Sequence, residues 1–242
     1  AGTYTLTVKD FNGCTADATV TITQPTEIIM TETHEDVICK NGTNGSITLS
    51  ASGGTPGYQY NINNGIYGGS NVFSGLTAGT YTMGVSDVNG CEKQIDVVIT
   101  EPTQITATYT TNTIGCAGGN NGTATVTASG GTPGYTYLWS NGQTGITATS
   151  LATGSHSVTI TDIKGCTLVK TVNYTDPAVL NVTMTTTVTS GVDQSNGTAT
   201  ATPSGGVGPY TYSWSNTQTT ATATGLIQGT YTVTVTDSKG CQ

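Results

Sequence analysis

The chain contains no arginine, and charged residues make up only 8% of its 242 positions. Its 14 acidic and 6 basic residues give a formal net charge of −8. A nucleic-acid-binding protein needs a basic surface, and an acidic membrane surface repels a chain of this charge. The composition therefore excludes nucleic acid and the membrane surface as partners.

Long apolar runs are also missing, since none approaches the roughly 20 residues that a membrane-spanning helix needs. Histidine occurs only as His34 and His156. None of the six cysteines stands in a Cys-x-x-Cys pair, which argues against a zinc knuckle or a thioredoxin-type site. Regularly placed cysteines in such a chain are typical of an exported protein in an oxidising compartment.

Glycine, threonine and β-branched residues are abundant, which is typical of all-β proteins, and an internal repeat organises them. The opening segment GTYTLTVKDFNGC recurs at residues 79–91, 154–166 and 229–241. SGGTPGYQY recurs in the same way, and an X-Pro step marks each boundary, at Gln24-Pro25, Glu101-Pro102 and Asp176-Pro177. The unit is therefore about 76 residues long.

The repeat period predicts the domain organisation. We expect four parts: residues 1–23 as the last strands of a preceding unit, 24–100 and 101–175 as complete units, and 176–242 as a unit without its final strand. Almost no linker separates the units, and proline stiffens each joint. We therefore expect the units to stack end to end as a rod.

Each unit reads as a series of short strands. Apolar residues alternate with threonine over residues 123–128, which is the period of a half-buried strand. About seven strands with turns every 8–12 residues indicate a small Ig-like β-sandwich. A later strand places aromatic side chains on its inward face, and we expect these to be core residues: Tyr58, Tyr60, Tyr135, Tyr137, Trp139, Tyr210, Tyr212 and Trp214.

A Leu-x-x-Gly-x-Tyr pattern precedes Tyr81 and Tyr231. It has the form of a tyrosine corner, in which the Tyr hydroxyl bonds to the backbone upstream in an Ig-like sandwich. The middle unit carries His156 at this position, so we expect a structural role for this histidine and not a catalytic one.

These motifs together resemble the SprB repeat family, which occurs in very large surface adhesins of gliding bacteria of the Flavobacterium type. The resemblance rests on Cys-x-x-x-x-Asn-Gly-Ser/Thr, Ser-Gly-Gly-Thr-Pro-Gly-Tyr-x-Tyr-x-Trp-Ser-Asn-Gly and Gly-Thr-Tyr-Thr-Val-x-Val-x-Asp-x-x-Gly-Cys, and it covers the whole chain. The aromatic segments also resemble PKD domains. The resemblance implies export through the type IX secretion system to the bacterial cell surface, and a role in adhesion and gliding.

No residue pattern points to catalysis, since no Ser-His-Asp or Cys-His set recurs between units. An aspartate does recur before each Gly turn, at Asp10, Asp87, Asp162 and Asp237. We expect each to accept backbone N–H bonds. Calcium is the alternative ligand, but each turn offers one carboxylate where calcium needs six to eight oxygens. We expect no cofactor.

The cysteines allow two pairings that keep the repeat spacing, and free thiols are a third alternative. The within-unit pairs are Cys39–Cys91 and Cys116–Cys166, and the cross-boundary pairs are Cys14–Cys39 and Cys91–Cys116. We favour the within-unit pairs, because an extended path across the joint exceeds the roughly 7 Å between Cα atoms that a disulfide allows. Cys14 and Cys241 are then unpaired within the chain.

The sequence thus predicts a structural segment, the stalk of a long secreted adhesin, and not an enzyme. Its expected partners are neighbouring repeats of the same chain, and surface polysaccharide or substratum is contacted through other domains. Two alternatives stay open: a module whose repeats bind polysaccharide directly, and an accessory segment of a secreted enzyme.

Overall fold

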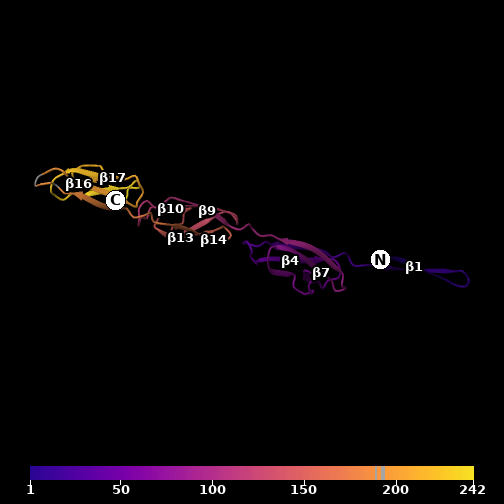
Figure 1. Cartoon of the computed structure of the whole chain (residues 1–242). Helices are drawn as coiled ribbons and strands as arrows, with labels where there is room; N and C mark the ends of the chain where they lie inside the picture. The colour runs from indigo at the N-terminus through magenta and orange to yellow at the C-terminus, as the bar shows by residue number, and fades with distance from the viewer. Residues whose placement is uncertain (189, 192–193) are drawn as a thin grey trace. The chain divides into compact units, whose positions relative to one another are not determined.

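The computed structural model describes residues 1–188, 190–191 and 194–242, and the described residues form strands and no helix. The chain divides into two compact structural units, Ala1–Gln104 and Ile105–Gln242, which are larger than the sequence repeats of about 76 residues. In Figure 1 the first unit runs from indigo to magenta and the second runs on to yellow. Each unit is described by itself below.

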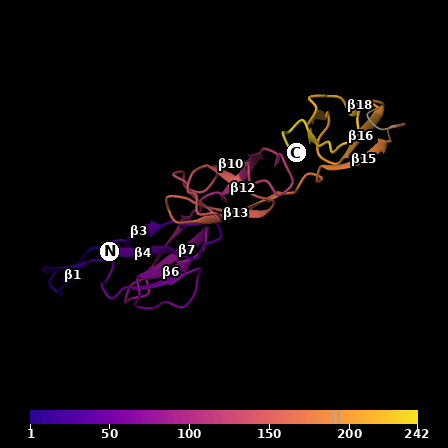
Figure 2. The same ribbon diagram turned by 90° about the vertical axis from the view of Figure 1, so that its left-hand side faces the viewer.

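The first unit consists of a hairpin followed by one sandwich. The hairpin strands are β1 (Gly2–Lys9) and β2 (Thr15–Ile22). The sandwich strands are β3 (Ile29–Glu35), β4 (Gly45–Ser52), β5 (Gln59–Ile62), β6 (Val72–Leu76), β7 (Gly79–Ser86) and β8 (Glu92–Ile99). They form two antiparallel sheets, ordered β3-β4-β6 and β5-β7-β8, and Figure 2 shows β3, β4 and β6 together. This is the A-B-E and C-F-G division of an Ig-like sandwich.

The core of this sandwich follows from the period-2 alternation of its strands. In β4, Ile47 and Leu49 are fully buried, and in β8, Val97 and Ile99 face the same core while their neighbours face solvent. Met83 of β7 completes the contact between the two sheets. Because successive side chains of a strand point to opposite faces, this apolar alternation fixes which face of each sheet lies inside.

The second unit contains two more sandwiches of the same design. The first has β9 (Thr106–Thr111), β10 (Gly122–Ser129), β11 (Thr136–Trp139), β12 (Thr147–Leu151), β13 (Gly154–Thr161) and β14 (Thr167–Tyr174). The other has β15 (Asn181–Thr187), β16 (Gly197–Ser204), β17 (Thr211–Trp214), β18 (Thr222–Leu226) and β19 (Val233–Thr236). Its second sheet contains only β17 and β19 among the described residues. The predicted domain boundaries stay a prediction.

The expected number of strands needs a correction, because residues 24–100 and 101–175, which are fully described, hold six strands each and not seven. After β11 the chain makes a tight turn in which the Trp139 N–H donates to the Gln143 carbonyl at 2.8 Å. The Asn141 and Gln143 side chains then bond to the backbone of Thr149. These bonds lead the chain directly into β12, so no further strand forms there.

Candidate functional site

The recurring aspartate ties two turns of each sandwich together. Asp87 Oδ1 accepts hydrogen bonds from the N–H groups of Asn89 and Cys91, at 2.9 and 2.8 Å, and its Oδ2 accepts from Thr55 N–H at 2.9 Å. Asp162 and Asp237 make the equivalent three bonds. Both carboxylate oxygens are therefore occupied by backbone donors.

The second glycine of each Ser-Gly-Gly turn leaves the space that this carboxylate occupies. Gly54 has a φ of +59°, and a Cβ there would lie 2.9 Å from Asp87 Oδ2. Gly131 and Gly206 stand in the same relation to Asp162 and Asp237, at 2.7 and 2.8 Å. Only glycine adopts this backbone conformation without cost and leaves room for the carboxylate. The motif therefore encodes a close approach between two turns.

The backbone donors also shift the titration of these carboxyls. For Asp87, the hydrogen bond from Thr55 N–H is the largest influence, and the pKa is lowered from its ordinary value of 3.8. For Asp162 and Asp237, burial is the largest influence and would raise the pKa, but their backbone donors together outweigh it and lower the pKa. The folded state therefore favours the ionised carboxylates.

The tyrosine-corner residues bond to the backbone four residues upstream. Tyr81 donates its hydroxyl proton to the Thr77 carbonyl at 2.9 Å, and Tyr231 lies 3.4 Å from the Ile227 carbonyl. His156 takes the same place, with its Nε2 2.9 Å from the Ala152 carbonyl, and its ring packs edge-on against Tyr174. The imidazole therefore has the position of the tyrosine and is held in the sandwich.

The predicted core aromatics divide into two groups. Trp139 and Trp214 are 2% and 3% exposed and lie in the cores of their sandwiches. The tyrosines are half-buried, and four of them lie against those two cores: Tyr135, Tyr137, Tyr210 and Tyr212. Tyr60 lies against the first core, whereas Tyr58 lies outside that cluster and donates to the Gly53 carbonyl. Tyr135 and Tyr210 make the same bond to Gly130 and Gly205, so this tyrosine also closes the Ser-Gly-Gly turn.

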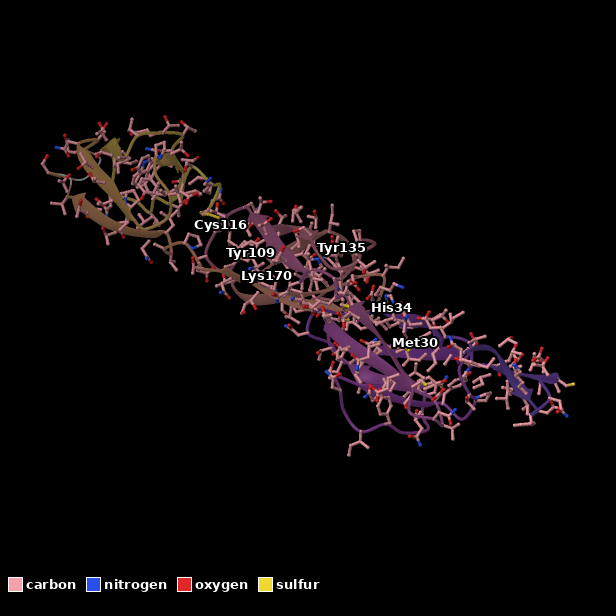
Figure 3. All side chains as sticks on the ribbon, turned by 90° about the vertical axis from the view of Figure 1, so that its right-hand side faces the viewer. Met30, His34, Tyr109, Cys116, Tyr135 and Lys170 are labelled. Carbon is pink, nitrogen blue, oxygen red and sulfur yellow. A yellow bond between two sulfur atoms is a disulfide. The ribbon has the colours of Figure 1, made fainter. Side chains whose placement is uncertain are left out.

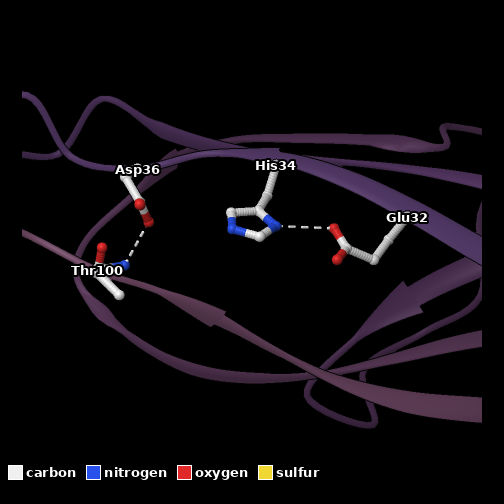
Figure 4. A network of polar contacts seen from close by, with 4 residues as sticks. All are labelled: Glu32, His34, Asp36 and Thr100. Atoms are coloured by element: carbon white, nitrogen blue, oxygen red, sulfur yellow. Dashed lines mark hydrogen bonds and ion pairs between the residues drawn. The ribbon is translucent and has the colours of Figure 1, made fainter.

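The other histidine, His34, lies on a surface strand. Its Nδ1 is 3.0 Å from Glu32 Oε2, and Figure 4 shows this pair beside Asp36, which accepts the Thr100 N–H at 2.6 Å. That backbone bond lowers the pKa of Asp36. Within the described parts of the chain, no group of three or more His, Cys, Asp or Glu is placed to hold a metal ion.

The cysteine pairing differs from the prediction. All six cysteines are described: Cys116 is bonded to Cys241 with Cα atoms 5.6 Å apart, Cys39 and Cys166 are disulfide-bonded, and Cys14 and Cys91 are free and exposed. The pairs predicted within one repeat, Cys39–Cys91 and Cys116–Cys166, are therefore wrong. The pairs predicted across a repeat boundary, Cys14–Cys39 and Cys91–Cys116, are wrong too. Cys241, which we expected to be unpaired, has a partner 125 residues away.

The strand order explains this correction. Cys116 follows β9, at the end of its sandwich where β14 finishes, as the hydrogen bond from the Tyr174 hydroxyl to the Thr123 carbonyl shows. Cys166 lies in the turn where β14 begins. An eight-residue strand at 3.3 Å per residue keeps these two ends roughly 26 Å apart. A cysteine at the end of one sandwich therefore meets the turn at the beginning of the next, and Figure 3 labels Cys116.

An acidic residue precedes the proline in two of the three X-Pro steps, and it reinforces the same end of the sandwich. Asp176 Oδ1 accepts the Gly118 N–H at 3.0 Å and the Thr153 hydroxyl. Glu101 is its equivalent: it pairs with Lys40 and accepts the Asn41 N–H at 2.6 Å. The bond with Lys40, followed by that with Asn41, lowers the pKa of Glu101. In the sequence these acids served only to mark the repeat boundaries. An acid after a strand and a Gly-rich loop whose backbone N–H groups need acceptors were the signals that could have predicted this contact.

The third sandwich carries a groove of about 540 Å³. Gly197, Leu226 and Tyr231 are among the residues that line it. In the first sandwich the glycine equivalent to Gly197 is Gly45, and a Cβ there would lie 3.0 Å from Ile99 of β8. The groove therefore lies at the position that β8 and β14 occupy in the first two sandwiches.

The structure thus defines a protein made of tandem Ig-like β-sandwich repeats, which are bound to one another through their ends in the second unit. A family model of the SprB repeat matches the chain three times, over residues 31–65, 108–144 and 192–219. The resemblance drawn from the sequence motifs is confirmed, because three segments of the chain match the SprB repeat.

The chain is also similar to solved structures of immunoglobulin-domain proteins. The N-terminal eight Ig domains of Down Syndrome Cell Adhesion Molecule match 88% of this chain at 13% identity and a TM-score of 0.39, and the chain spans 32% of that structure. Sidekick-1 immunoglobulin domains 1–5 match 99% of it at 11% identity and a TM-score of 0.35, and the chain spans 64% of that structure. No curated protein matches the chain by sequence.

The family match supports the coarser part of the functional expectation. The chain is a repeat segment of the adhesin type, and SprB repeats are a non-catalytic family of cell-surface adhesins. Its disulfides are typical of an extracellular protein. Over the described ranges, no helix has the length and apolar character to cross a membrane.

Proposed function

We propose that this chain is a stalk segment of a long adhesin, exported by the type IX secretion system to the surface of a gliding bacterium. In this role the chain gives the adhesin length and transmits force along it. Its direct partners are neighbouring SprB repeats, and binding of polysaccharide or substratum belongs to other domains. The observation that carries the proposal is the covalent bond between successive repeats, Cys116–Cys241.

This bond changes how tension passes along the chain. A force that enters before Cys116 and leaves after Cys241 is carried by the disulfide, so the 125-residue stretch between the two cysteines is not pulled straight. Strands β10 to β14 of the second sandwich and β15 to β19 of the third lie inside that stretch. The bond joins the far loop of one sandwich to the near turn of the next and belongs to no single core. Such a bond suits a tether that is held under load.

Force spectroscopy on the full chain tests the proposal. At 3.3–3.6 Å per residue, the closed stretch corresponds to roughly 410–450 Å of extended chain. In a Cys39→Ser/Cys166→Ser background, in which Cys116–Cys241 is the remaining disulfide, we expect the chain to unfold to a contour length shorter by that amount than the same chain with Cys116→Ser/Cys241→Ser added. The matched control is Cys14→Ser/Cys91→Ser, which removes two free thiols and leaves the contour length unchanged. Equal lengths for all three chains contradict a load-bearing role.

A further inference from the structure

Cys91 and Cys241 occupy the same place in their repeats but differ in state. Each closes an Asp-x-x-Gly-Cys turn, and the N–H of each donates to the aspartate four residues before it, at 2.8 and 2.9 Å. Cys241 is bonded to the loop that carries Cys116, whereas Cys91 is a free, exposed thiol. The turn that carries a disulfide in one repeat therefore carries a free thiol in the other.

A hollow of about 290 Å³ lies beside Cys91. Gln24, Pro25, Ile28, Gly54 and Cys91 line it. The salt bridge between Lys93 and Glu27, at 2.7 Å, pairs two of the three charged residues that line it, and the third is Glu92. The hollow is thus built from the X-Pro step, the Ser-Gly-Gly turn and the cysteine turn of one repeat.

In the second unit, the equivalent surface is occupied by a loop of the preceding repeat. That loop is fixed at two points: Gly118 N–H donates to Asp176 at 3.0 Å, and Cys116 is bonded to Cys241, whose sulfur lies 3.4 Å from the Gly115 carbonyl. Asp176 and Cys241 correspond in the repeat to Gln24 and Cys91. The hollow therefore offers an equivalent of each residue that fixes the loop. Cys91 corresponds to Cys241, and the side-chain carbonyl of Gln24 can accept an N–H bond as the Asp176 carboxylate does.

We propose that the hollow beside Cys91 is the docking site for the first-cysteine loop of a further SprB repeat, and that Cys91 forms a disulfide with the cysteine of that loop. The loop has the form of residues 114–121, IGCAGGNN, which carry no charge and therefore bring no like charge toward Glu92 at the rim. A second copy of this chain does not supply it, because the cysteines of both its loops, Cys39 and Cys116, are already disulfide-bonded. This inference goes beyond the stalk proposal, since it concerns recognition between repeats and not load.

The bond forms by thiol–disulfide exchange, which needs no separate oxidant when the loop cysteine arrives as a mixed disulfide. The Cys91 thiolate attacks the loop sulfur, a new S–S bond forms, and the former partner thiolate leaves with the electron pair. Docking before attack raises the local concentration of the loop disulfide at Cys91. The rate at Cys91 therefore reports docking.

The test uses the full chain and a peptide of residues 110–123, TTNTIGCAGGNNGT, whose cysteine carries 5-thio-2-nitrobenzoate. Variant Cys14→Ser leaves Cys91 as the free thiol, and variant Cys91→Ser leaves Cys14. Cys14 is a matched control: it is exposed, and its N–H bonds to Asp10 at 2.8 Å in the same turn. Its turn joins the two strands of the sheet β1-β2, whereas the Cys91 turn is bonded through Asp87 to Thr55, which follows the Ser-Gly-Gly turn. We expect release of thionitrobenzoate to be at least about tenfold faster from Cys91 than from Cys14.

Two further measurements separate docking from mere reactivity. A peptide of the same composition in scrambled order is expected to react at Cys91 and Cys14 within about twofold, and Gln24→Ala is expected to reduce the Cys91 preference at least about threefold. Equal rates at both thiols overturn the proposal, and so does an unchanged Cys91 preference with the scrambled peptide. Cys91–Cys91 linked chains in glutathione disulfide, without a preference for the loop peptide, would make a second copy the occupant and overturn the assignment.

Discussion

At the scale of single residues, the buried aspartates explain why three distant motifs recur together. The carboxylate of Asp87 requires the glycine at Gly54 for space and the N–H groups of Thr55 and Cys91 as donors. A carboxylate that is shielded from water without such donors is unfavourable, because it loses its hydration. The SGG segment and the Asp-x-x-Gly-Cys segment are therefore two halves of one structure.

These aspartates predict a loss of stability in acid. Their folded-state pKa values lie below the ordinary 3.8, so their contribution is present above pH 3.8 and is lost as the pH falls through the lower folded-state value. We expect the urea midpoint of unfolding to drop as the pH falls below 3.8, and Asp87→Asn and Asp162→Asn to flatten that drop. The matched control is Asn89→Ala, which keeps all three backbone donors. The idea fails if the Asn variants retain the wild-type pH profile.

At the scale of elements, β11 shows how one strand serves both core and surface. Trp139 is 2% exposed, and its Nε1 donates to the Gly145 carbonyl at 2.9 Å, whereas the adjacent Leu138 is 56% exposed. Neighbouring residues of a strand face opposite sides of the sheet. The indole therefore fills the sandwich and also holds the turn toward β12.

We expect Trp139→Ala to destabilise its sandwich by about 3–5 kcal/mol, because it leaves a large cavity and an unpaired carbonyl. Leu138→Ala on the opposite face is the matched control, with an expected change within about 0.5 kcal/mol. Urea unfolding followed by circular dichroism gives both values. Similar destabilisation by the two variants would show that the two faces of β11 are not differentiated as described.

The hairpin β1–β2 has the sequence of a core hairpin but lies outside any sandwich. Leu6 is 65% exposed, whereas Met83, its equivalent in β7, is fully buried. A two-stranded hairpin alone is marginally stable in water. We expect the amides of β1 and β2 to exchange hydrogen at least about a hundred times faster than those of β7 and β8 in the same sample. Equal protection would require a partner surface over the hairpin.

At the scale of the whole molecule, the Cys116–Cys241 bond is expected to stabilise the third sandwich, whose second sheet has two described strands. Closing 125 residues contributes about 5 kcal/mol in the chain-entropy account. We expect Cys241→Ser to lower the urea midpoint of this sandwich, read from Trp214 fluorescence in a Trp139→Phe background, and Cys14→Ser to leave it unchanged. An unaltered midpoint in Cys241→Ser would mean that the bond links repeats without stabilising them.

The sequence by itself determined everything that depends on local order. The alternation that buries Ile47 and Leu49, the unit of about 76 residues and the aspartate turns follow from period, turn chemistry and repetition, which are properties of neighbouring residues. The strand count was less accessible, because the bonds of Asn141 and Gln143 to Thr149 reach across a turn.

Only the tertiary structure decided the cysteine pairing. Sequence spacing favoured Cys116–Cys166, since both cysteines belong to one repeat. The direction of β14 places them at opposite ends of the sandwich, and the contact between successive ends brings Cys116 to Cys241. Disulfide formation depends on the distance between two sulfurs in space, and that distance is set by how whole sheets and repeats meet.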